Sequence, residues 1–350
     1  MQPAAEYQQE TNSPSIDFYH ILRLLSAKIR IFPALCVYLQ WIFLFIYNMM
    51  LIADSGSTKT DWAWIENGTI VHRVTTAGIN PVHQGEEEIL VECGVWNVEG
   101  EMHQDQAHST NLTPHSSFHT PQTVPQWGAD EVFFYGAGCI PEKKGVVEKV
   151  LRKVFSDADR IEVESDLLGA ARAVCQHQEG LACILGTGSN SCLYDGEKIV
   201  GNIPPLGYIL GDEGSGAVLG KLFLNALFKG ALPDGMKEDF LQSSGLSYPE
   251  IIQRVYRQPM ANRFLASTSL YISEHLDVPA LRELVKQNFR DFFHKNIAQY
   301  GRHDLSVGAI GSIAYHYRDL LQEVAEEEGY NLSKIAKSPM EGLVAYHLMK

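Results

Sequence analysis

The sequence predicts an α/β fold built from a duplicated domain. Two stretches, residues 51–70 and 184–199, carry the same order of elements: an apolar strand, a polar elbow rich in glycine and hydroxyl side chains, an outgoing strand, an Asx-Gly turn and a returning strand. Strands and amphipathic helices alternate along the rest of the chain, as is typical of α/β proteins. Because the first turn of each hairpin is unusual, its recurrence indicates an internal duplication.

Each element of the two repeats has a local reason. Apolar runs predict the first strands at residues 49–53 and 181–185, and the elbows follow at residues 54–60 and 186–191. Asn-Gly and Asp-Gly pairs predict the tight hairpin turns, because these residues tolerate positive φ angles. The turns and the remaining strands are predicted at Asn67-Gly68, Asp195-Gly196 and residues 61–66, 69–76, 192–194 and 198–203.

The segments outside the repeats alternate in the same way. The predicted order is a strand (129–139), a helix (142–155), a strand (160–165), a helix (166–177), a glycine-rich loop leading into a helix (206–230), further helices (including 279–300), and a strand, glycine turn and helix (305–329). Residues 99–126 follow no regular pattern. Four histidines there lack cysteines and ordered spacing, so we predict a loop rather than a metal site.

Composition limits the classes of partner. The net charge is −14 over 350 residues, and an acidic chain repels nucleic-acid backbones. The hydrophobic content of 45% suits a globular protein with a real core. The six cysteines are scattered, with no C-x-x-C pair and no zinc-site spacing, which fits a reducing compartment.

The two elbows are the first candidates for chemistry. Each brings backbone N–H groups and hydroxyls to a point where a strand reverses, and such concavities bind phosphate oxygens. Glycine allows the ligand to approach the backbone closely. Two elbows facing each other would therefore clamp a triphosphate from both sides. Neither elbow is a Walker A motif, and no G-x-G-x-x-G opens a βαβ unit.

Carboxylates and one amide stand near these elbows or at strand ends. Asp54 is suited to hold Mg²⁺ through water beside phosphates. Asp166, between a strand and a helix, is either an N-cap or a general base that takes the proton of an attacking sugar hydroxyl. Asp212 and Glu213 are either caps or acceptors for sugar hydroxyls, and Asn80 is either a turn residue or an amide contact.

Seven motifs together make the chain resemble the N-acetylglucosamine kinase family, part of the BadF/BadG/BcrA/BcrD-type ATPase group within the actin, Hsp70 and sugar-kinase superfamily. They stand at residues 54–61, 135–139, 164–173, 185–191, 207–216, 307–312 and 338–347. The resemblance covers roughly residues 49–350. It implies two ribonuclease-H-like (actin-like ATPase) domains with a cleft between them. It also implies ATP and Mg²⁺ as cofactors and phosphorylation of N-acetylglucosamine, or a related amino sugar, at the 6-hydroxyl.

The resemblance also assigns roles to residues. It implies a first phosphate loop of Gly56, Ser57, Thr58 and Lys59, and a second of Gly186, Thr187, Gly188, Ser189 and Asn190. It implies Asp54 for Mg²⁺, Asp166 as the catalytic base, Gly308, Gly311 and Ser312 for adenosine, and Asn80, Gly207, Asp212 and Glu213 for the sugar. The expected partner is a small-molecule sugar, and a homodimer is left open.

The predicted domains follow the duplication. The first comprises residues 49–165, with an irregular insert at about 94–126, and is completed by a C-terminal helix at about 338–350; the second comprises residues 166–337. Residues 93–126 fall where the family has an amphipathic helix. If that helix is missing, packing of the first domain and activity would suffer.

Residues 1–48 have no counterpart in the family. They contain most of an uncharged run of 23 residues, 31–53, which follows three basic residues and is long enough to span a bilayer. This segment is a signal-anchor, a cleaved signal peptide without an evident cleavage site, or an upstream extension outside the functional protein. Because the expected chemistry needs ATP, we favour the extension and predict a cytoplasmic protein. The alternative is a membrane-anchored one.

Other functions stay open at this point. An ATPase activator of a 2-hydroxyacyl-CoA dehydratase would share both phosphate loops but needs an iron–sulfur cluster held by cysteines from two subunits. Here Cys175, Cys183 and Cys192 lie on a predicted helix and strands, which suits packing. The chain could also be a sugar sensor without catalysis. The sequence does not distinguish N-acetylglucosamine from N-acetylmuramic acid, glucosamine or glucose.

Overall fold

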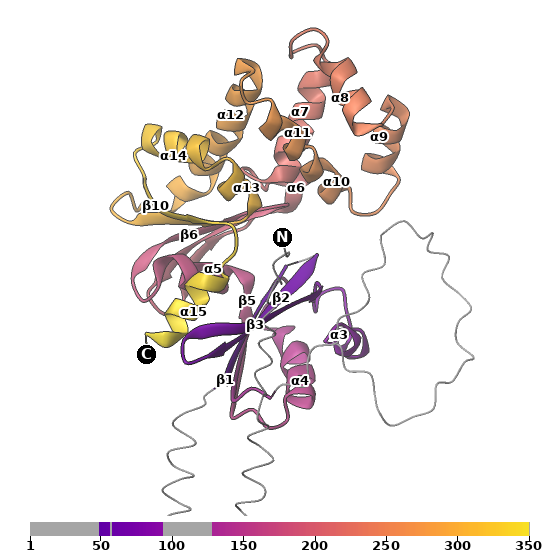
Figure 1. Ribbon diagram of the computed structural model, residues 1–350. Coiled ribbons are helices and arrows are strands. Elements are labelled where there is room, and N and C mark those ends of the chain that lie inside the picture. The colour runs from indigo at the N-terminus through magenta and orange to yellow at the C-terminus, as the bar shows by residue number, and fades with distance from the viewer. Residues whose placement is uncertain (1–48, 57, 94–127, 350) are drawn as a thin grey trace, which may run out of the picture. The chain divides into compact units, whose positions relative to one another are not determined.

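Two five-stranded sheets form the framework of the part of the chain that the computed structural model describes, residues 49–56, 58–93 and 128–349 (Figure 1). Their strand orders are β3-β2-β1-β4-β5 and β10-β9-β6-β7-β8. If the strands of each half are numbered from 1 to 5 along the chain and the second sheet is read in reverse, both sheets have the order 3-2-1-4-5. In both halves three consecutive strands pair antiparallel, the first of them pairs with a parallel strand, and that strand pairs with a second parallel strand at the edge. The predicted α/β fold with two duplicated ribonuclease-H-like domains is therefore confirmed.

The strands of the two halves occupy separate parts of the chain. The first sheet contains β1 (Met49–Ser55), β2 (Lys59–Glu66), β3 (Thr69–Ala77), β4 (Glu131–Gly136) and β5 (Arg160–Ser165). The second contains β6 (Glu179–Leu185), β7 (Ser189–Asp195), β8 (Ile199–Ile203), β9 (Ser306–Ile310) and β10 (Asn331–Ala336). We keep a division at residues 165 and 166 as a proposal, because α5, which follows it, packs on both sheets.

Helices cover both faces of each sheet. Those that pack on the first sheet are α3 (Glu86–Glu92), α4 (Lys144–Val154), α5 (Asp166–Cys175) and α15 (Met340–Leu348). The second half also contains α6 (Gly207–Leu210), α7 (Gly216–Phe228), α8 (Met236–Ser244), α9 (Tyr248–Tyr256), α10 (Ala261–Ser267), α11 (Ser269–Glu274), α12 (Pro279–Lys295), the 3₁₀-helix η2 (Ile297–Tyr300), α13 (Ser312–His316) and α14 (Arg318–Glu327).

The alternation of side chains along the strands builds three core clusters. Leu51 and Ala53 of β1 pack on the side of α3 and α4, whereas Met50 and Ile52 face α5 and α15. The cluster that contains Met50 and Ile52 continues into the second sheet through residues such as Ala182, so α5 and α15 lie between the two sheets (Figure 1). The opposite face of the second sheet packs against helices that include α7, α8, α12 and α14.

Helix α5 is fitted between the sheets with little free space. A Cβ added at Gly308 of β9 would lie 2.4 Å from the Val174 side chain. A Cβ at Gly342 of α15 would lie 2.4 Å from the carbonyl oxygen of Ala173. These glycines therefore let β9 and α15 approach α5 more closely than any larger residue would allow.

Helix α15 joins the end of the chain to the first sheet. The His347 ring stacks on Phe133 with 3.8 Å between ring centroids, and its Nε2 lies 2.8 Å from the Tyr135 hydroxyl oxygen. Arg172 of α5 donates to the same hydroxyl at 2.8 Å and forms an ion pair with Glu162. The C-terminal helix, α5 and the first sheet are thus joined by one polar cluster.

Some predicted boundaries were wrong. Asp54 and Ser55 belong to β1, because they pair with Asp61 and Thr60, so the first elbow is shorter than residues 54–60. The predicted helix within residues 305–329 is two helices, α13 and α14, which meet at Tyr317. Strand β10 was not predicted.

The apolar run at residues 31–53 is not one helix, because residues 49–53 form most of the central strand β1. The other predictions for residues 1–48, for the segment of about 94–126 and for Ser57 lie outside the described residues. Within the described ranges, no helix has both the length and the apolar character needed to cross a membrane.

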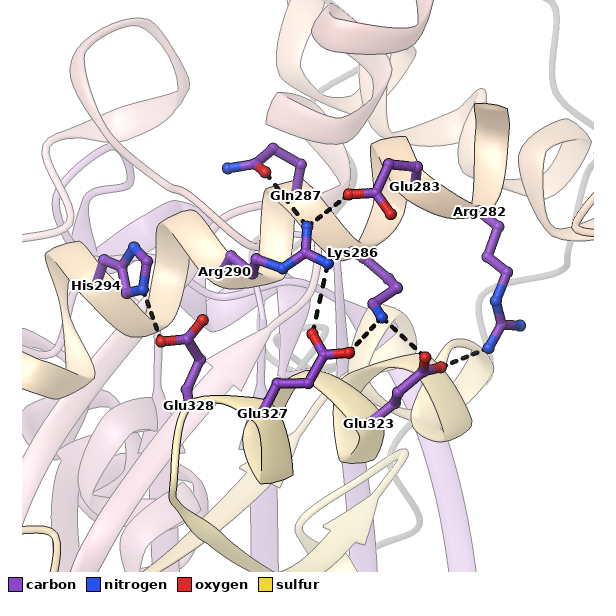
Figure 2. Close-up of polar contacts among 9 residues, drawn as sticks. All are labelled: Arg282, Glu283, Lys286, Gln287, Arg290, His294, Glu323, Glu327 and Glu328. Atoms are coloured by element: carbon purple, nitrogen blue, oxygen red, sulfur yellow. Dashed lines mark hydrogen bonds and ion pairs between the residues drawn. The ribbon is translucent and has the colours of Figure 1, made fainter. Parts of the chain in front are cut away.

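An ion-pair network fastens α12 to α14 in the second half (Figure 2). Lys286 is only 8% exposed and donates to Glu323 at 2.8 Å and to Glu327 at 2.6 Å. Both hydrogen bonds raise the pKa of Lys286. Arg282 also pairs with Glu323, and Arg290 with Glu327, so cations of α12 alternate with carboxylates of α14. Surface ion pairs contribute to stability mainly where several charges form a network, as they do here.

Replacing Lys286 by methionine should lower the thermal midpoint by roughly 3–5 °C, because two carboxylates lose their shared covered partner. The measurement is thermal unfolding followed by circular dichroism. Lys237→Met is the matched control, since Lys237 is exposed and, within the described part of the chain, forms an ion pair only with the adjacent Glu238, at 3.2 Å. Equal midpoints for the two variants would contradict a stabilising role of the network.

Candidate active site

A cavity of about 1050 Å³ lies between residues of both sheets. Its first-half lining consists of Asp54, Gly56, Thr58, Lys59, Asp61, Trp62, Arg73, Val74, Thr75 and Ala137, and α5 contributes Asp166 and Ala170. The second-half lining consists of Ile184, Gly186, Thr187, Gly188, Ser189, Asn190, Asp212, Ile310, Gly311, Ser312 and Tyr315, and the segment leading into α15 adds residues 335–341. The cavity therefore collects the two elbows, Asp54, Asp166 and Asp212, which are far apart in sequence.

The first elbow, Gly56 to Lys59, is braced by backbone hydrogen bonds. Gly56 donates its N–H to the Lys59 carbonyl at 3.0 Å, and Gly78 donates to the Thr58 carbonyl at 3.2 Å. The Lys59 ammonium group lies 2.6 Å from a carboxylate oxygen of Asp61, whose other oxygen accepts from the Thr75 hydroxyl at 2.8 Å. A cation held beside exposed backbone in a concave elbow is suited to phosphate.

The second elbow, Gly186 to Gly188, is built in the same way. Gly186 donates its N–H to the Gly188 carbonyl at 2.9 Å. Two N–H groups at the start of α7 hold the elbow from outside: Gly216 donates to the Gly186 carbonyl at 2.8 Å and Ala217 to the Thr187 carbonyl at 3.1 Å. A Cβ at Gly188 would come within 3.0 Å of an Asp212 carboxylate oxygen, so glycine lets that carboxylate lie against the elbow.

Asp166 opens α5 at the floor of the cavity. Its neighbour Ser165 caps the helix by accepting from the Leu168 N–H at 3.2 Å, so Asp166 is not the N-cap. One Asp166 carboxylate oxygen accepts from the Leu167 N–H at 2.8 Å. Burial raises the pKa of Asp166, and the backbone hydrogen bonds only partly offset this. The free energy of its ionised form is therefore raised by the surrounding protein.

Asp54, near the end of β1, also lines the cavity and lies close enough to Asp166 for the two charges to interact. Burial, together with the nearby charges of Asp166 and Asp61, raises the pKa of Asp54 to about 7, and Lys59 opposes the shift. The carboxylates of Asp54, Asp61 and Asp166 thus lie close enough to repel one another, and Lys59 offsets this only in part. A bound cation would relieve this repulsion.

The donor set fits Mg²⁺ better than a metal held entirely by protein. Among the described residues, no group of three or more His, Cys, Asp or Glu side chains is arranged to hold a metal. Mg²⁺ commonly takes one or two carboxylates and completes its coordination with water and phosphate oxygens. Asp54, beside the phosphate-type elbows, supplies such a carboxylate.

Asp212 belongs to a strained loop beside the second elbow. It has a positive φ of 54°, which is uncommon for a residue other than glycine. Burial raises the pKa of Asp212 to about 6, although the N–H groups of Gly207 and Ser189 donate to its carboxylate. The cap of α7 is Ser215, which accepts from Val218, so Asp212 does not act as a helix cap.

Four predicted site residues do not line the cavity. Asn80 accepts from the Val82 N–H at 3.0 Å, as a turn residue does, although it packs against Gly138 beside the cavity-lining Ala137. Glu213 pairs with Lys295 at 3.1 Å. Gly207 donates its N–H to the Asp212 carboxylate, and Gly308 faces α5. Gly311 and Ser312 do line the cavity.

Several lining residues were not predicted as site residues. Arg73 of β3 and Glu341 of α15 form an ion pair at 2.7 Å across one wall. Tyr315, one turn after Ser312, and Lys337, just before α15, line the part of the cavity near Gly311. Lys337 immediately precedes the motif at residues 338–347, and its adjacency to that motif was the available signal.

Known structures resemble the chain over most of its length. One from Porphyromonas gingivalis is 46% identical, covers 85% of this chain and 98% of its own, and has a TM-score of 0.74. One from Chromobacterium violaceum is 17% identical, covers 85% of this chain and 98% of its own, and has a TM-score of 0.61, a likeness of fold alone. Both are described as a "putative N-acetylglucosamine kinase". No protein-family model and no curated protein matched the chain.

Replacing Asp54 by asparagine should stabilise the ligand-free protein at neutral pH. The Asp54 carboxyl binds its proton more tightly in the folded than in the unfolded chain. The stabilisation of the folded protein by this bound proton is therefore complete below pH 4 and is lost as pH rises towards 7. The variant should be more stable than wild type by on the order of 4 kcal/mol at pH 8 and equal to it near pH 4. Urea unfolding at both pH values measures this difference.

Asp195→Asn provides a control of opposite sign. Hydrogen bonds from the Lys198 and Glu197 N–H groups lower the pKa of Asp195, so this variant should lose stability at pH 8. If the Asp54→Asn variant were less stable than wild type at pH 8, the interpretation that burial and neighbouring carboxylates make ionised Asp54 destabilising would be wrong.

Proposed function

The chain belongs to the N-acetylglucosamine kinase family, and on that premise we propose that it transfers the γ-phosphate of ATP to the 6-hydroxyl of N-acetylglucosamine or a closely related amino sugar. Family membership makes it a sugar kinase, a phosphotransferase with an alcohol group as acceptor. The observation that carries the finer proposal is the shared cavity, in which both elbows, Asp54, Asp166 and Asp212 line one space.

The phosphates of ATP would lie between the two elbows. Phosphoryl transfer depends mainly on positioning and on stabilising charge, and the paired glycine turns offer backbone N–H groups from both halves. Lys59 would exchange its contact with Asp61 for phosphate oxygens. Adenosine would extend towards Gly311, Ser312, Tyr315 and Lys337.

Asp54 would hold Mg²⁺, through water or directly. When bound, Mg²⁺ supplies neutralisation of the negative charge on the transferring phosphoryl group. This assignment is supported by the raised pKa of Asp54, since a carboxylate enclosed among other carboxylates gains from a nearby cation. Lys59 beside Asp61 supplies positive charge to the same side of the cavity.

Asp166 is proposed as the general base. The sugar hydroxyl must lose its proton as it attacks the phosphorus, and a carboxylate in the cavity with a raised pKa is a suitable acceptor near neutral pH. The Leu167 N–H donates to one carboxylate oxygen and so fixes the orientation of the side chain. Asp212 would accept from sugar hydroxyls, and Asn80, Gly207 and Glu213 would act from positions beside the cavity lining.

The rival function, activation of a dehydratase, gains no support from Cys175, Cys183 or Cys192. Cluster ligands must be thiolates. Burial raises the pKa of Cys175 to about 11 and of Cys192 to about 12, and Cys183 is shifted upwards as well. These thiols pack in the core. A sugar sensor without catalysis is the other rival, and the presence of Asp166 in the cavity favours the enzyme.

A cytoplasmic location and homodimer formation stay parts of the proposal. Dependence on ATP supports the cytoplasm, and the small-molecule sugar is the expected partner. Mass spectrometry of the native N-terminus tests whether the functional protein begins near Met49, and light scattering tests the dimer.

A sugar panel tests the proposed function. ADP release should rise with added N-acetylglucosamine and should exceed the rate with glucose, glucosamine or N-acetylmuramic acid by at least about tenfold. The measurement is a coupled ADP assay, with ³¹P NMR of the product to locate the phosphate. ADP release that is unaffected by every sugar would support the sensor instead.

Asp166→Asn should lower turnover by about 10²–10⁴-fold, because the amide cannot accept the hydroxyl proton. The KM values for ATP and sugar should change less than about threefold, since the side chain keeps its shape. Asp157→Asn, at an exposed acid, is the matched control. Wild-type turnover by Asp166→Asn would show that another group takes the proton.

A further inference from the structure

Two fully buried hydroxyls meet at the root of the first elbow. Ser55 ends β1 and Thr60 lies opposite it in β2; both side chains are 0% exposed, and their oxygens are 2.7 Å apart. Neither residue lines the cavity, and the reaction proposed above uses neither. Burying a hydroxyl costs free energy unless it is hydrogen-bonded.

The second half of the molecule shows that the fold does not require this pair. β6 ends one residue before its elbow glycine, as β1 does, but its last residue is Leu185, also 0% exposed. An aliphatic side chain thus satisfies the packing at the equivalent position. The polar pair in the first half calls for a different explanation.

The two hydroxyls connect the elbow to the segment that follows β3. Ile79 donates its N–H to the Ser55 hydroxyl at 2.9 Å, and the Thr60 hydroxyl lies 3.0 Å from the Ala77 carbonyl. Ser55 is also 3.1 Å from the Ile79 carbonyl. The two hydroxyl groups thus make three oxygen–oxygen contacts: with each other, with the Ile79 carbonyl and with the Ala77 carbonyl. They have only two protons, so one of these contacts always lacks a hydrogen bond. The shortest distance favours a continuous chain from Ile79 N–H through Ser55 and Thr60 to the Ala77 carbonyl.

This chain of hydrogen bonds begins at Ile79, next to Asn80, the proposed sugar-binding residue of the first half. Asn80 follows Ile79, its N–H donates to the Gln84 side chain at 2.6 Å, and its own side chain lies over Gly138, where an added Cβ would be 2.2 Å from the amide oxygen. Ala137, which lines the cavity, lies beside Asn80. The position of Asn80 is therefore set on one side by the close approach to Gly138 and on the other by the hydrogen bond from the Ile79 N–H to the Ser55 hydroxyl.

We propose that the Ser55–Thr60 pair is a positioning element that couples nucleotide binding to sugar binding. Phosphate bound at the first elbow would restrict the motion of the ends of β1 and β2. The hydrogen bonds through the two hydroxyls would then restrict the motion of Ile79 and Asn80 as well. Such coupling is reciprocal, so sugar would tighten nucleotide binding by the same factor. The inference rests on the proposed function, because it assumes phosphate at the elbow and sugar beside Asn80.

The test measures coupling directly. Isothermal titration gives the Kd of N-acetylglucosamine without and with a saturating non-hydrolysable ATP analogue and Mg²⁺. Wild type should bind the sugar about tenfold more tightly with the analogue present. In Ser55→Ala and Thr60→Val this factor should fall to below about twofold, while the Kd of the analogue alone changes less than about threefold. A merely structural role would not change the ratio selectively.

Two controls separate hydroxyl chemistry from packing. Thr60→Ser keeps the hydroxyl and should keep the coupling. Ser191→Ala removes another fully buried hydroxyl, bonded to the Tyr300 hydroxyl at 2.9 Å in the second half, and should also keep it. Thermal melts confirm that each variant is folded, and Thr60→Val decides the question if Ser55→Ala is not.

The outcomes distinguish this inference from the proposed function. If wild type binds both ligands but without coupling, or if both hydroxyl-deleting variants keep the wild-type factor, the inference is wrong and the kinase proposal stands. If wild type binds neither the analogue nor any sugar of the panel, the proposed function fails and the inference fails with it.

Discussion

The close packing of α5 between the two sheets is the constraint on which the site depends. Val174 fills the space over Gly308 of β9, Ala173 meets Gly342 of α15, and the helix begins with Asp166 at the cavity floor. Interiors are packed as densely as organic crystals, so a helix fixed on several sides moves little. The position of the Asp166 carboxylate relative to the elbows is therefore set by apolar contacts well away from it.

Duplication supplied two similar elbows, and their surroundings give them different chemistry. Four residues separate the paired Ser55 and Thr60, whereas three separate the paired Leu185 and Ser189, so the first elbow is one residue longer. The first ends at Lys59, a cation held by Asp61. The second has the Asp212 carboxylate against it. The first elbow thus carries a cation and the second lies against a hydrogen-bond acceptor, an asymmetry that suits a reaction with two different substrates.

Local chemistry made much of this architecture predictable. The Asn67-Gly68 turn has the positive φ angles that the residue pair suggested, and the two elbows follow from glycines after apolar strands. What failed depended on distant contacts. The G-x-x-G-S pattern at residues 308–312 does not reveal that Gly308 faces Val174 whereas Gly311 faces the cavity. Likewise, nothing local in Arg73 indicates that α15 will meet it.

The chain's last helix completes a core that its first described strand begins. Met50 and Ile52 of β1 share a cluster with Leu343 and Val344 of α15. Because synthesis proceeds from the N-terminus, the first sheet is made well before α15, which packs on its inner face. The inner core of the first half therefore becomes complete only after the strands of the second half have been made. Until then α5 covers that face without α15, so part of its apolar surface remains exposed.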